Sequence, residues 1–554
     1  MKFEPEALAA GASPLVVVLS AEGQAQAQAH AGEGAATATA ATATPAAEWR
    51  PLFRHECAFG PDAFGSVMEN LIQNPNINSS WLFRADILVD SSSSSSSPPA
   101  AQTQAQATPG SPDSAPLPLP LPAPAFVGFE LTRTIVRRLI PRNALRDKPL
   151  DQTCLIYASA PLAPGQARTQ AKSLVVYLPH VSAPSEMPFY HPVVQGIAFL
   201  HEWDQAKGCG SISLSYLYFA EGDHEHKQQQ QDSDAATRLT RTALQLLAVV
   251  YKHGKGRLAG YEKRVHHDQL IPQARVQNTY ARLKEKYARE LIDAWAEATD
   301  PEKHVFEDLC IAAFLLELWA DMYGAGLGPL RFPGFVDIGC GNGLLVHILN
   351  REGFQGWGFD ARARKSWAAY NSKLKTRDGG EQDTLRELIL LPPHVRRDGL
   401  AGALDASRIH DGRFPKGTFI ISNHADELTP WTPVLAALSD CPFLAIPCCS
   451  HNLAGERYRA PAPKDKTKAD SAYSSLVVWV AGIAADCGWE VEQEMLRIPS
   501  TRNTALLGRH RVTGSPSSSS PVVGLQAVVD KYGGTAGYLE SVMKLMASSS
   551  GQEH

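Results

Sequence analysis

The chain has 554 residues, of which 44% are hydrophobic and 20% are charged, enough apolar material to form the cores of two or three domains. Its formal net charge of −5 excludes a histone-like or polybasic protein, so any contact with nucleic acid must come from local basic patches. The nine cysteines are an odd number without a C-x-x-C pair, which indicates free thiols in a reducing compartment and predicts a cytoplasmic location.

Several segments have too few large side chains to form a packed core. Residues 1–47 are predicted to be a disordered, low-complexity N-terminus, since 21–47 consist almost entirely of Ala, Thr, Gln and Gly. The Ser- and Pro-rich residues 91–124 and the His- and Gln-rich residues 223–234 are predicted to be disordered insertions within one domain. A Ser-rich linker and a C-terminal helix are expected over 514–554.

Between these segments the pattern of apolar residues changes once. Residues 48–299 are predicted to form an α+β N-terminal domain, with an alternating strand over Ile212–Phe219 and helices over 239–253 and 274–297. A helix with a thick apolar face over 302–323 begins the second domain, 300–513. There the order strand, glycine loop, helix, strand predicts an α/β, Rossmann-like fold. No apolar run is long enough to span a membrane.

The most specific motif follows the predicted strand Phe335–Ile338. Asp337 opens a D-x-G-x-G-x-G string that ends at Gly343, and a second short strand ends at Asp360, where an acid can accept both hydroxyls of an adenosine ribose. A dinucleotide site would need its third glycine one residue later, and Asp337 would repel a pyrophosphate but attract a sulfonium and an amino group. S-adenosylmethionine is therefore favoured over NAD, and we assign cofactor binding to Asp337, Gly339, Gly341, Asn342, Gly343, Asp360 and Asn423.

Candidate residues for binding the substrate that receives the methyl group follow the next predicted strands. After 417–422 comes N-H-A-D-E-L-T-P, without the N-P-P-Y or D-P-P-Y typical of enzymes that methylate base amines. Asp426 and Glu427 in this string can be catalytic or can be N-terminal charges of a helix that begins near Thr429. After the strand Phe443–Ile446 come Cys448, Cys449 and His451, which lack the two-residue gap and the second pair of ligands of a zinc site, so no metal is predicted. A nucleophilic thiol for uracil C5 methylation stays an alternative.

Basic residues gather in four places, which favours a phosphate backbone as partner. The clusters lie within 133–148, 252–264, 362–365 and 497–511. One of them directly follows the acid at the end of the second strand. Charge runs are more often solvated faces, and only their number in an acidic chain favours nucleic acid.

Several long motifs resemble one known family. F-V-D-I-G-C-G-N-G-L-L-V-H, S-N-H-A-D-E-L-T-P-W, I-P-C-C-S, R-T-I-V-R-R-L-I-P-R-N and G-Y-E-K-R-V-H-H-D are similar to the eukaryotic, fungal-type tRNA (uracil-2′-O-)-methyltransferases that act on uridine 44 of serine tRNAs. The resemblance covers most of residues 126–510. It implies a class I S-adenosylmethionine-dependent enzyme that forms 2′-O-methyluridine in the cytoplasm, with tRNA(Ser) as partner and without DNA or membrane.

The resemblance also implies roles for individual residues. By analogy with the Lys-Asp-Lys-Glu set of many 2′-O-methyltransferases, the predicted catalytic residues are Lys365, Asp426 and Glu427. The predicted RNA-binding residues are Arg137, Arg138, Arg142, Lys263, Arg264, Arg362 and Arg364. The catalytic base, the mode of tRNA recognition, the oligomeric state and any partner protein stay open.

Two other classes of function are compatible with the residues. One is another RNA methyltransferase or a small-molecule methyltransferase, whose basic patches would be incidental. The other is a non-catalytic RNA-binding adaptor with a methyltransferase fold, against which the intact glycines and Asp360 argue. Competition by polynucleotide with a steep salt dependence distinguishes RNA binders from the small-molecule enzyme.

Overall fold

The computed structural model describes residues 2–9, 15–17, 48–92, 117–143, 146–160, 170–219, 229–261, 267–324, 332–375, 379–395, 406–463, 471–512 and 521–548. Contacts divide the chain into two compact units, Met1–Glu262 and Lys263–His554. This division comes earlier in the sequence than the boundary predicted near residue 300. The reason is that α4 (Gln273–Asp293) packs on α5 (Pro301–Tyr323), with Leu283, Tyr287 and Leu291 in the core of the second unit.

The segments predicted to be disordered lie largely outside the described residues, but four parts of them are described. β1 (Glu6–Ala7) pairs with β2, and Leu15 is buried, both within the predicted N-terminal segment. In the Pro-rich segment, the Leu121 amide donates a hydrogen bond to Thr153. α3 (Gln229–Leu258) begins inside the predicted insertion 223–234. At the C-terminus two helices, α10 (Pro521–Lys531) and α11 (Tyr538–Ser548), stand where one was predicted.

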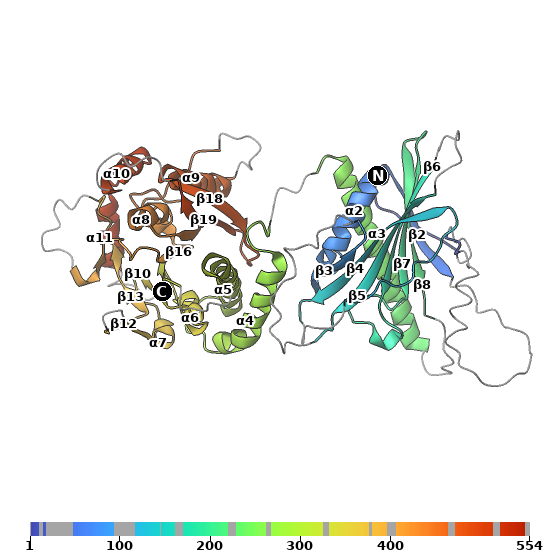
Figure 1. The fold of residues 1–554 in the computed structure, drawn as a ribbon, viewed down its shortest axis with the longest axis horizontal. Helices are drawn as coiled ribbons and strands as arrows, with labels where there is room; N and C mark the ends of the chain where they lie inside the picture. The colour runs from blue at the N-terminus through green and yellow to red at the C-terminus, as the bar shows by residue number, and fades with distance from the viewer. Residues whose placement is uncertain are drawn as a thin grey trace, which may run out of the picture. The chain divides into compact units, whose positions relative to one another are not determined.

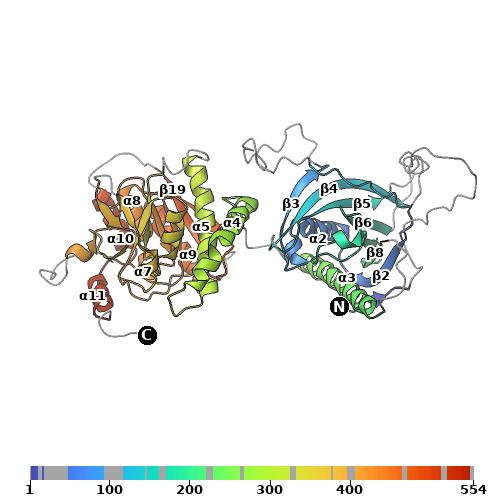
Figure 2. The same ribbon diagram turned by 90° about the horizontal axis from the view of Figure 1, so that it is seen from below.

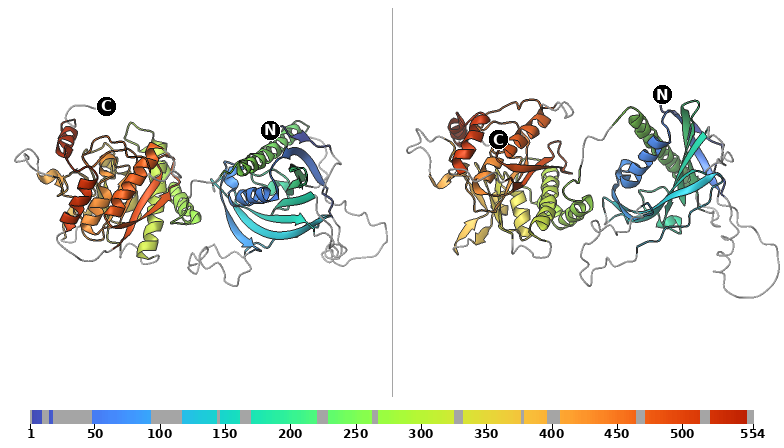
Figure 3. Two further views of the ribbon diagram at one scale, coloured as in Figure 1. Left: turned by 90° about the horizontal axis from the view of Figure 1, so that it is seen from above. Right: turned by 45° about the horizontal axis from the view of Figure 1, so that its top comes forward.

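The first unit is an antiparallel sheet of eight strands that curves around two helices (Figures 1–3). The strand order is β1-β2-β8-β7-β6-β5-β4-β3. The helices are α2 (Pro61–Gln73) and the long α3. The other strands are β2 (Trp49–Cys57), β3 (Leu82–Asp90), β4 (Phe129–Pro141), β5 (Leu150–Ser159), β6 (Gln170–Pro179), β7 (Gly196–Asp204) and β8 (Cys209–Leu217).

The predicted strand over Ile212–Phe219 corresponds to β8, and its alternation has a clear structural basis. Ile212, Leu214 and Tyr216 point to one face, where they join Leu71 of α2 and Leu247 of α3 in a hydrophobic core. The serines between them, Ser211, Ser213 and Ser215, are also buried. The concave face of the sheet is therefore filled by side chains from both helices.

The second unit is a sheet of seven strands in the order β13-β10-β9-β16-β17-β19-β18. The first five strands are parallel to one another, whereas β19 is antiparallel to both of its neighbours. The strands are β9 (Phe335–Ile338), β10 (Gly356–Asp360), β13 (Leu385–Glu387), β16 (Phe419–Asn423), β17 (Phe443–Ile446), β18 (Trp489–Met495) and β19 (Thr504–Arg511).

Helices cover both faces of this sheet, which explains why the central strands β9, β16 and β17 are buried along almost their whole length. Alternate residues enter different cores: Phe335 and Phe419 pack with α4, α5 and α6 (Leu344–Arg351), while Val336 and Ile420 pack with the helices of the opposite face. Those helices are α8 (Thr432–Ser439), α9 (Ala472–Asp486), α10 and α11. The α/β prediction for this part of the chain is confirmed. Within the described residues, no helix has the length and apolar character needed to cross a membrane.

Candidate functional site

A cavity of about 390 Å³ opens in the second unit where parallel strands end. The loops after β9, β10 and β16 line it with Gly339, Gly341, Asp360 and His424, and α11 contributes Tyr538. Because β9 lies between β10 and β16 and all three run in one direction, their carboxyl ends meet at one edge of the sheet. Ligands of open α/β sheets bind at such an edge.

The glycine loop needs its glycines for backbone conformation and for space. Gly339, Gly341 and Gly343 all have positive φ, at 71°, 53° and 77°. A Cβ on Gly343 would lie 2.5 Å from Leu385, whereas a Cβ on Gly341 would meet nothing within 4 Å and would project from the cavity wall. Asn342 precedes Gly343, the N-cap residue of α6, and its Oδ1 accepts the Leu344 amide at 2.9 Å. The loop thus leaves backbone exposed to a ligand at Gly339 and Gly341.

Asp360 lies at the end of β10 and lines the cavity, as predicted. One carboxylate oxygen accepts the Gly341 amide at 3.0 Å and the other accepts the Arg362 amide at 3.2 Å. A carboxylate fixed in this way retains lone pairs for the two hydroxyls of a ribose.

A group of buried acids lies behind the glycine loop. Asp337 is 2% exposed, and its Oδ1 has no hydrogen-bond partner among the described residues. Asp308, on α5, accepts a hydrogen bond from Asn423 at 3.2 Å. Burial and the neighbouring Glu307 raise the pKa of Asp308 to about 8. Burial, with Asp308 and Asp360 nearby, also raises the pKa of Asp337 well above its ordinary value.

These acids fit a cationic ligand. An unsatisfied buried carboxylate is costly, and a nearby positive charge would favour its ionised form. The sulfonium and the amino group of S-adenosylmethionine supply positive charge, so the residues present fit this cofactor. Asp308 and Glu307 were not predicted as site residues because they come from α5, ahead of the whole glycine motif in the sequence.

His424 and Glu307 form a second pair that the sequence analysis did not single out. His424 lines the cavity directly after β16, and its Nε2 lies 3.2 Å from the Glu307 carboxylate. Its Nδ1 is buried without a hydrogen-bond partner among the described residues. Both His424 and Asp426 have a positive φ, 52° and 42°, a backbone conformation that residues other than glycine seldom adopt. Such strain is common at functional sites.

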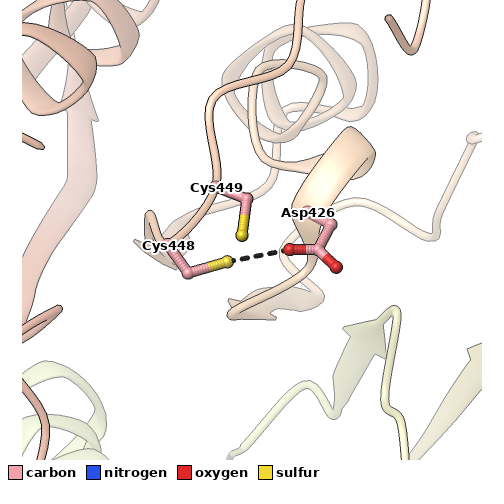
Figure 4. A group of neighbouring side chains, drawn as sticks. All are labelled: Asp426, Cys448 and Cys449. Atoms are coloured by element: carbon pink, nitrogen blue, oxygen red, sulfur yellow. Dashed lines mark hydrogen bonds between the residues drawn. The ribbon is translucent and has the colours of Figure 1, made fainter. Parts of the chain in front are cut away.

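The three predicted catalytic residues are placed differently. Asp426 and Glu427, in the short helical turn η5 (Asp426–Leu428), line the cavity. Lys365 is exposed and, among the described residues, does not line it. Cys448 donates a hydrogen bond to Asp426 at 3.1 Å, and Cys449 lies beside both (Figure 4). Burial and the Asp426 carboxylate raise the pKa of both thiols, which disfavours a thiolate nucleophile.

The predicted RNA-binding arginines separate into buried and exposed ones. Arg137 is 3% exposed; its guanidinium donates to Gln152 and to the carbonyl groups of Leu71 and Ile72, so it cannot reach a phosphate. Arg138 forms a two-point ion pair with Asp151. Arg142 is exposed, and Arg362 and Arg364 line the cavity of the second unit. Lys263 and Arg264 lie outside the described residues.

An exposed aromatic–arginine patch on the first unit surrounds Arg142. It consists of Trp81, Arg142, Arg146, Phe189 and Arg238. Trp81 is 42% exposed and Phe189 57%, and their rings meet edge to face at 5.4 Å. Arg146 lies over Trp81 and Arg238 over Phe189, while the Arg142 amide donates to the Trp81 carbonyl.

Comparison with known proteins agrees with this division. Residues 25–264 match the family profile "TRM44-like, N-terminal bet v1-like domain", and residues 270–379 match "Predicted AdoMet-dependent methyltransferase". A curated protein of Neurospora crassa is 59% identical over 91% of this chain and 94% of its own length. Proteins of Aspergillus oryzae (40%; 85% and 84%) and Schizosaccharomyces pombe (36%; 91% and 93%) are also similar. All three are named tRNA (uracil-O(2)-)-methyltransferase.

Proposed function

This chain belongs to the tRNA (uracil-O(2)-)-methyltransferase family, and we propose that it transfers a methyl group from S-adenosylmethionine to the 2′-oxygen of a uridine in tRNA. The observation that carries the proposal is the cavity at the sheet edge, where Asp360 and a glycine loop adjoin buried acids. We also infer that the second unit has the Rossmann-like class I fold. The strand order, with one antiparallel strand near its edge, supports this inference.

The cofactor-binding roles follow from the positions of the residues. Asp360 would bind the ribose hydroxyls, and the exposed backbone at Gly339 and Gly341 would lie against the ligand. Asp337, with Asp308 held by Asn423, would face the positive charge of the methionine end. Gly343 and Asn342 act through the loop and the start of α6 rather than by contact.

When bound, S-adenosylmethionine supplies an electrophilic methyl group next to a sulfonium. The remaining requirement is to orient a ribose hydroxyl and to accept its proton. His424 is the base that the geometry favours, because it lines the cavity and Glu307 can orient its ring and stabilise the imidazolium. Asp426 and Glu427 line the same wall and stay in the proposal as groups that bind the acceptor. Lys365 is left out of this proposal, since it is exposed and is not among the residues that line the cavity.

For the RNA we propose that the aromatic–arginine patch binds the tRNA. Exposed rings stack on unpaired bases, and arginines beside them neutralise phosphates. Arg142 keeps its predicted role, whereas Arg137 is replaced by Arg146 and Arg238. Arg362 and Arg364, at the cavity itself, are proposed to hold the backbone next to the reacting nucleotide.

Two finer points rest on other grounds. Position 44 of tRNA(Ser) is proposed from the motif resemblance alone. A cytoplasmic location is proposed because all nine cysteines are free, as expected in a reducing compartment.

The experiment is methyl transfer from labelled S-adenosylmethionine to total tRNA, followed by nucleoside analysis. We expect label in 2′-O-methyluridine with the wild-type chain, and little label with His424→Ala although that variant still binds the cofactor. Label in a base-methylated uridine would contradict the 2′-O assignment and favour the thiols as nucleophiles. Cofactor binding without any methyl transfer would favour the non-catalytic adaptor.

A further inference from the structure

A second set of chemically reactive side chains adjoins the cavity but takes no part in the cofactor site. β16 and β17 are parallel neighbours, with Asn423 opposite Ile446, so the turns after the two strands emerge side by side. The first turn carries Asp426 and the second carries Cys448 and Cys449. Figure 4 shows the three side chains converging, and one ligand atom of each lies within 4.8 Å of the other two.

We propose that Asp426, Cys448 and Cys449 together bind one Zn²⁺ ion, with the fourth position left to a water or a substrate oxygen. Two sulfurs and one carboxylate oxygen suit zinc, whereas Mg²⁺ and Ca²⁺ prefer oxygen ligands only. Three protein ligands and one open position are the arrangement typical of catalytic zinc sites. Sequence spacing did not predict a metal because the third ligand comes from the neighbouring strand, not from a second cysteine pair.

The backbone at Asp426 and a hydrogen bond between two of the side chains also support the arrangement. Asp426 has a φ of 42°, in the left-handed region, so its side chain is held at some conformational cost. The hydrogen bond from Cys448 to Asp426, 3.1 Å long, already joins two of the three ligand atoms. Zinc binding would release the two thiol protons, and the negative charges of the two remaining thiolates would balance the dication.

The position of the ion suggests a role in activating the acceptor hydroxyl, and this role rests on the proposed function. The binding of zinc itself does not depend on that function. Asp426 lines the cavity, so an ion held by its carboxylate would lie beside the acceptor side of the site. Coordination to zinc lowers the pKa of a hydroxyl group, as it lowers that of zinc-bound water. The acceptor O–H bond would break with its proton passing to His424. The oxygen would then bond to the methyl carbon as the carbon–sulfur bond breaks, its electron pair returning to sulfur.

The test uses the full chain, freed of metal with a chelator and titrated with Co²⁺ under reducing conditions. We expect one ion per chain, with tetrahedral visible bands and a near-ultraviolet thiolate-to-cobalt band that Zn²⁺ abolishes. Cys448→Ser and Cys449→Ser should each remove about half of that band, and Asp426→Asn should weaken cobalt binding by about tenfold or more.

Two matched variants serve as controls. Cys209→Ser removes an exposed thiol of the first unit, and Glu427→Gln neutralises the carboxylate next to Asp426; both should bind cobalt as the wild type does. Thermal unfolding of every variant without metal shows whether it folds. A wild-type chain without the thiolate band would overturn the proposal, as would an unchanged band in the double variant of Cys448 and Cys449. Neither result depends on methyl transfer, so both are distinct from failure of the proposed function.

Discussion

Asp360 has two tasks at once, since its carboxylate fixes the Gly341 and Arg362 amides and also lines the cavity. We predict that Asp360→Ala weakens S-adenosylmethionine binding by on the order of tenfold to a hundredfold, because hydrogen bonds to a charged group contribute about 1.5–3 kcal/mol. Isothermal titration calorimetry measures the change. A dissociation constant equal to that of the wild type would contradict the ribose-binding role.

Asp308 makes a prediction about pH. Burial raises its pKa from 3.8 to about 8, so between these values the folded chain holds a proton that the unfolded chain releases. The free energy of unfolding should therefore fall as the pH rises through this window and level off above it. Asp308→Asn cannot ionise and should lack this part of the slope. Urea unfolding at several pH values within the window measures the free energy of unfolding of the wild-type chain and of Asp308→Asn. The same pH dependence in both would refute the prediction.

Arg137 is a structural residue rather than an RNA ligand. Its removal leaves the Gln152 side chain and the Leu71 and Ile72 carbonyl groups without their buried donor. We predict that Arg137→Ala lowers the free energy of unfolding by about 1–3 kcal/mol or more. Exposed Arg142→Ala, five residues further along, is the control and should change it by less than about 0.5 kcal/mol. Denaturant unfolding measures both variants, and a loss for Arg137→Ala as small as the one expected for Arg142→Ala would contradict the structural role of Arg137.

At the scale of elements, two glycines in the turn from β9 into α6 have different roles, Gly343 in stability and Gly341 in binding. We predict that Gly343→Ala destabilises the second unit, since a Cβ would lie 2.5 Å from Leu385 at a φ of 77°. Gly341→Ala meets no atom within 4 Å, so it should cost only the ~1–2 kcal/mol of a left-handed residue while placing a methyl group on the cavity wall. The melting temperature should fall more in Gly343→Ala, and the cofactor affinity should fall more in Gly341→Ala. A Gly343→Ala variant that lost affinity without a lower melting temperature would be inconsistent with this packing.

The elements that the sequence predicted well are those whose pattern is local. The strands at Phe335–Ile338 and Phe443–Ile446 and the helix Pro301–Tyr323 lie where the apolar runs placed them. The curved sheet of the first unit was predicted only at β8, where apolar and polar residues alternate. β5, β6 and β7 are buried along most of their length, and their residues do not alternate in this way. The predicted helix near Thr429 begins at Thr432, after the turn η5.

The same distinction applies to the candidate site. The glycine loop and Asp360 belong to one continuous motif, and the structure places Gly339, Gly341 and Asp360 at one cavity. Their roles in binding stay predictions. The pairing of His424 with Glu307 could not be predicted, since it depends on how α5 packs beside the end of β16. Likewise, no sequence pattern separates buried Arg137 from exposed Arg142, because both belong to one basic run.

At the scale of the whole molecule, the aromatic–arginine patch and the cofactor site belong to different compact units. We predict that Arg142→Ala combined with Arg146→Ala weakens tRNA binding and lowers the salt dependence of the affinity by about one unit of slope per lost phosphate contact. Cofactor affinity should not change. Binding measured across a range of salt concentrations tests this, and an unchanged slope would remove the aromatic–arginine patch from the proposed RNA surface.

The connection between β3 and β4 has a practical consequence. These strands are antiparallel neighbours, with Asp90 opposite Ile135, although the low-complexity residues 93–116 lie between them in the sequence. The entropy of closing a loop rises only with the logarithm of its length, about 0.6 kcal/mol for each doubling. The strand pairing is therefore insensitive to the length of residues 93–116. That makes it a natural point at which to splice in a fluorescent reporter or an affinity handle, leaving both chain ends untouched.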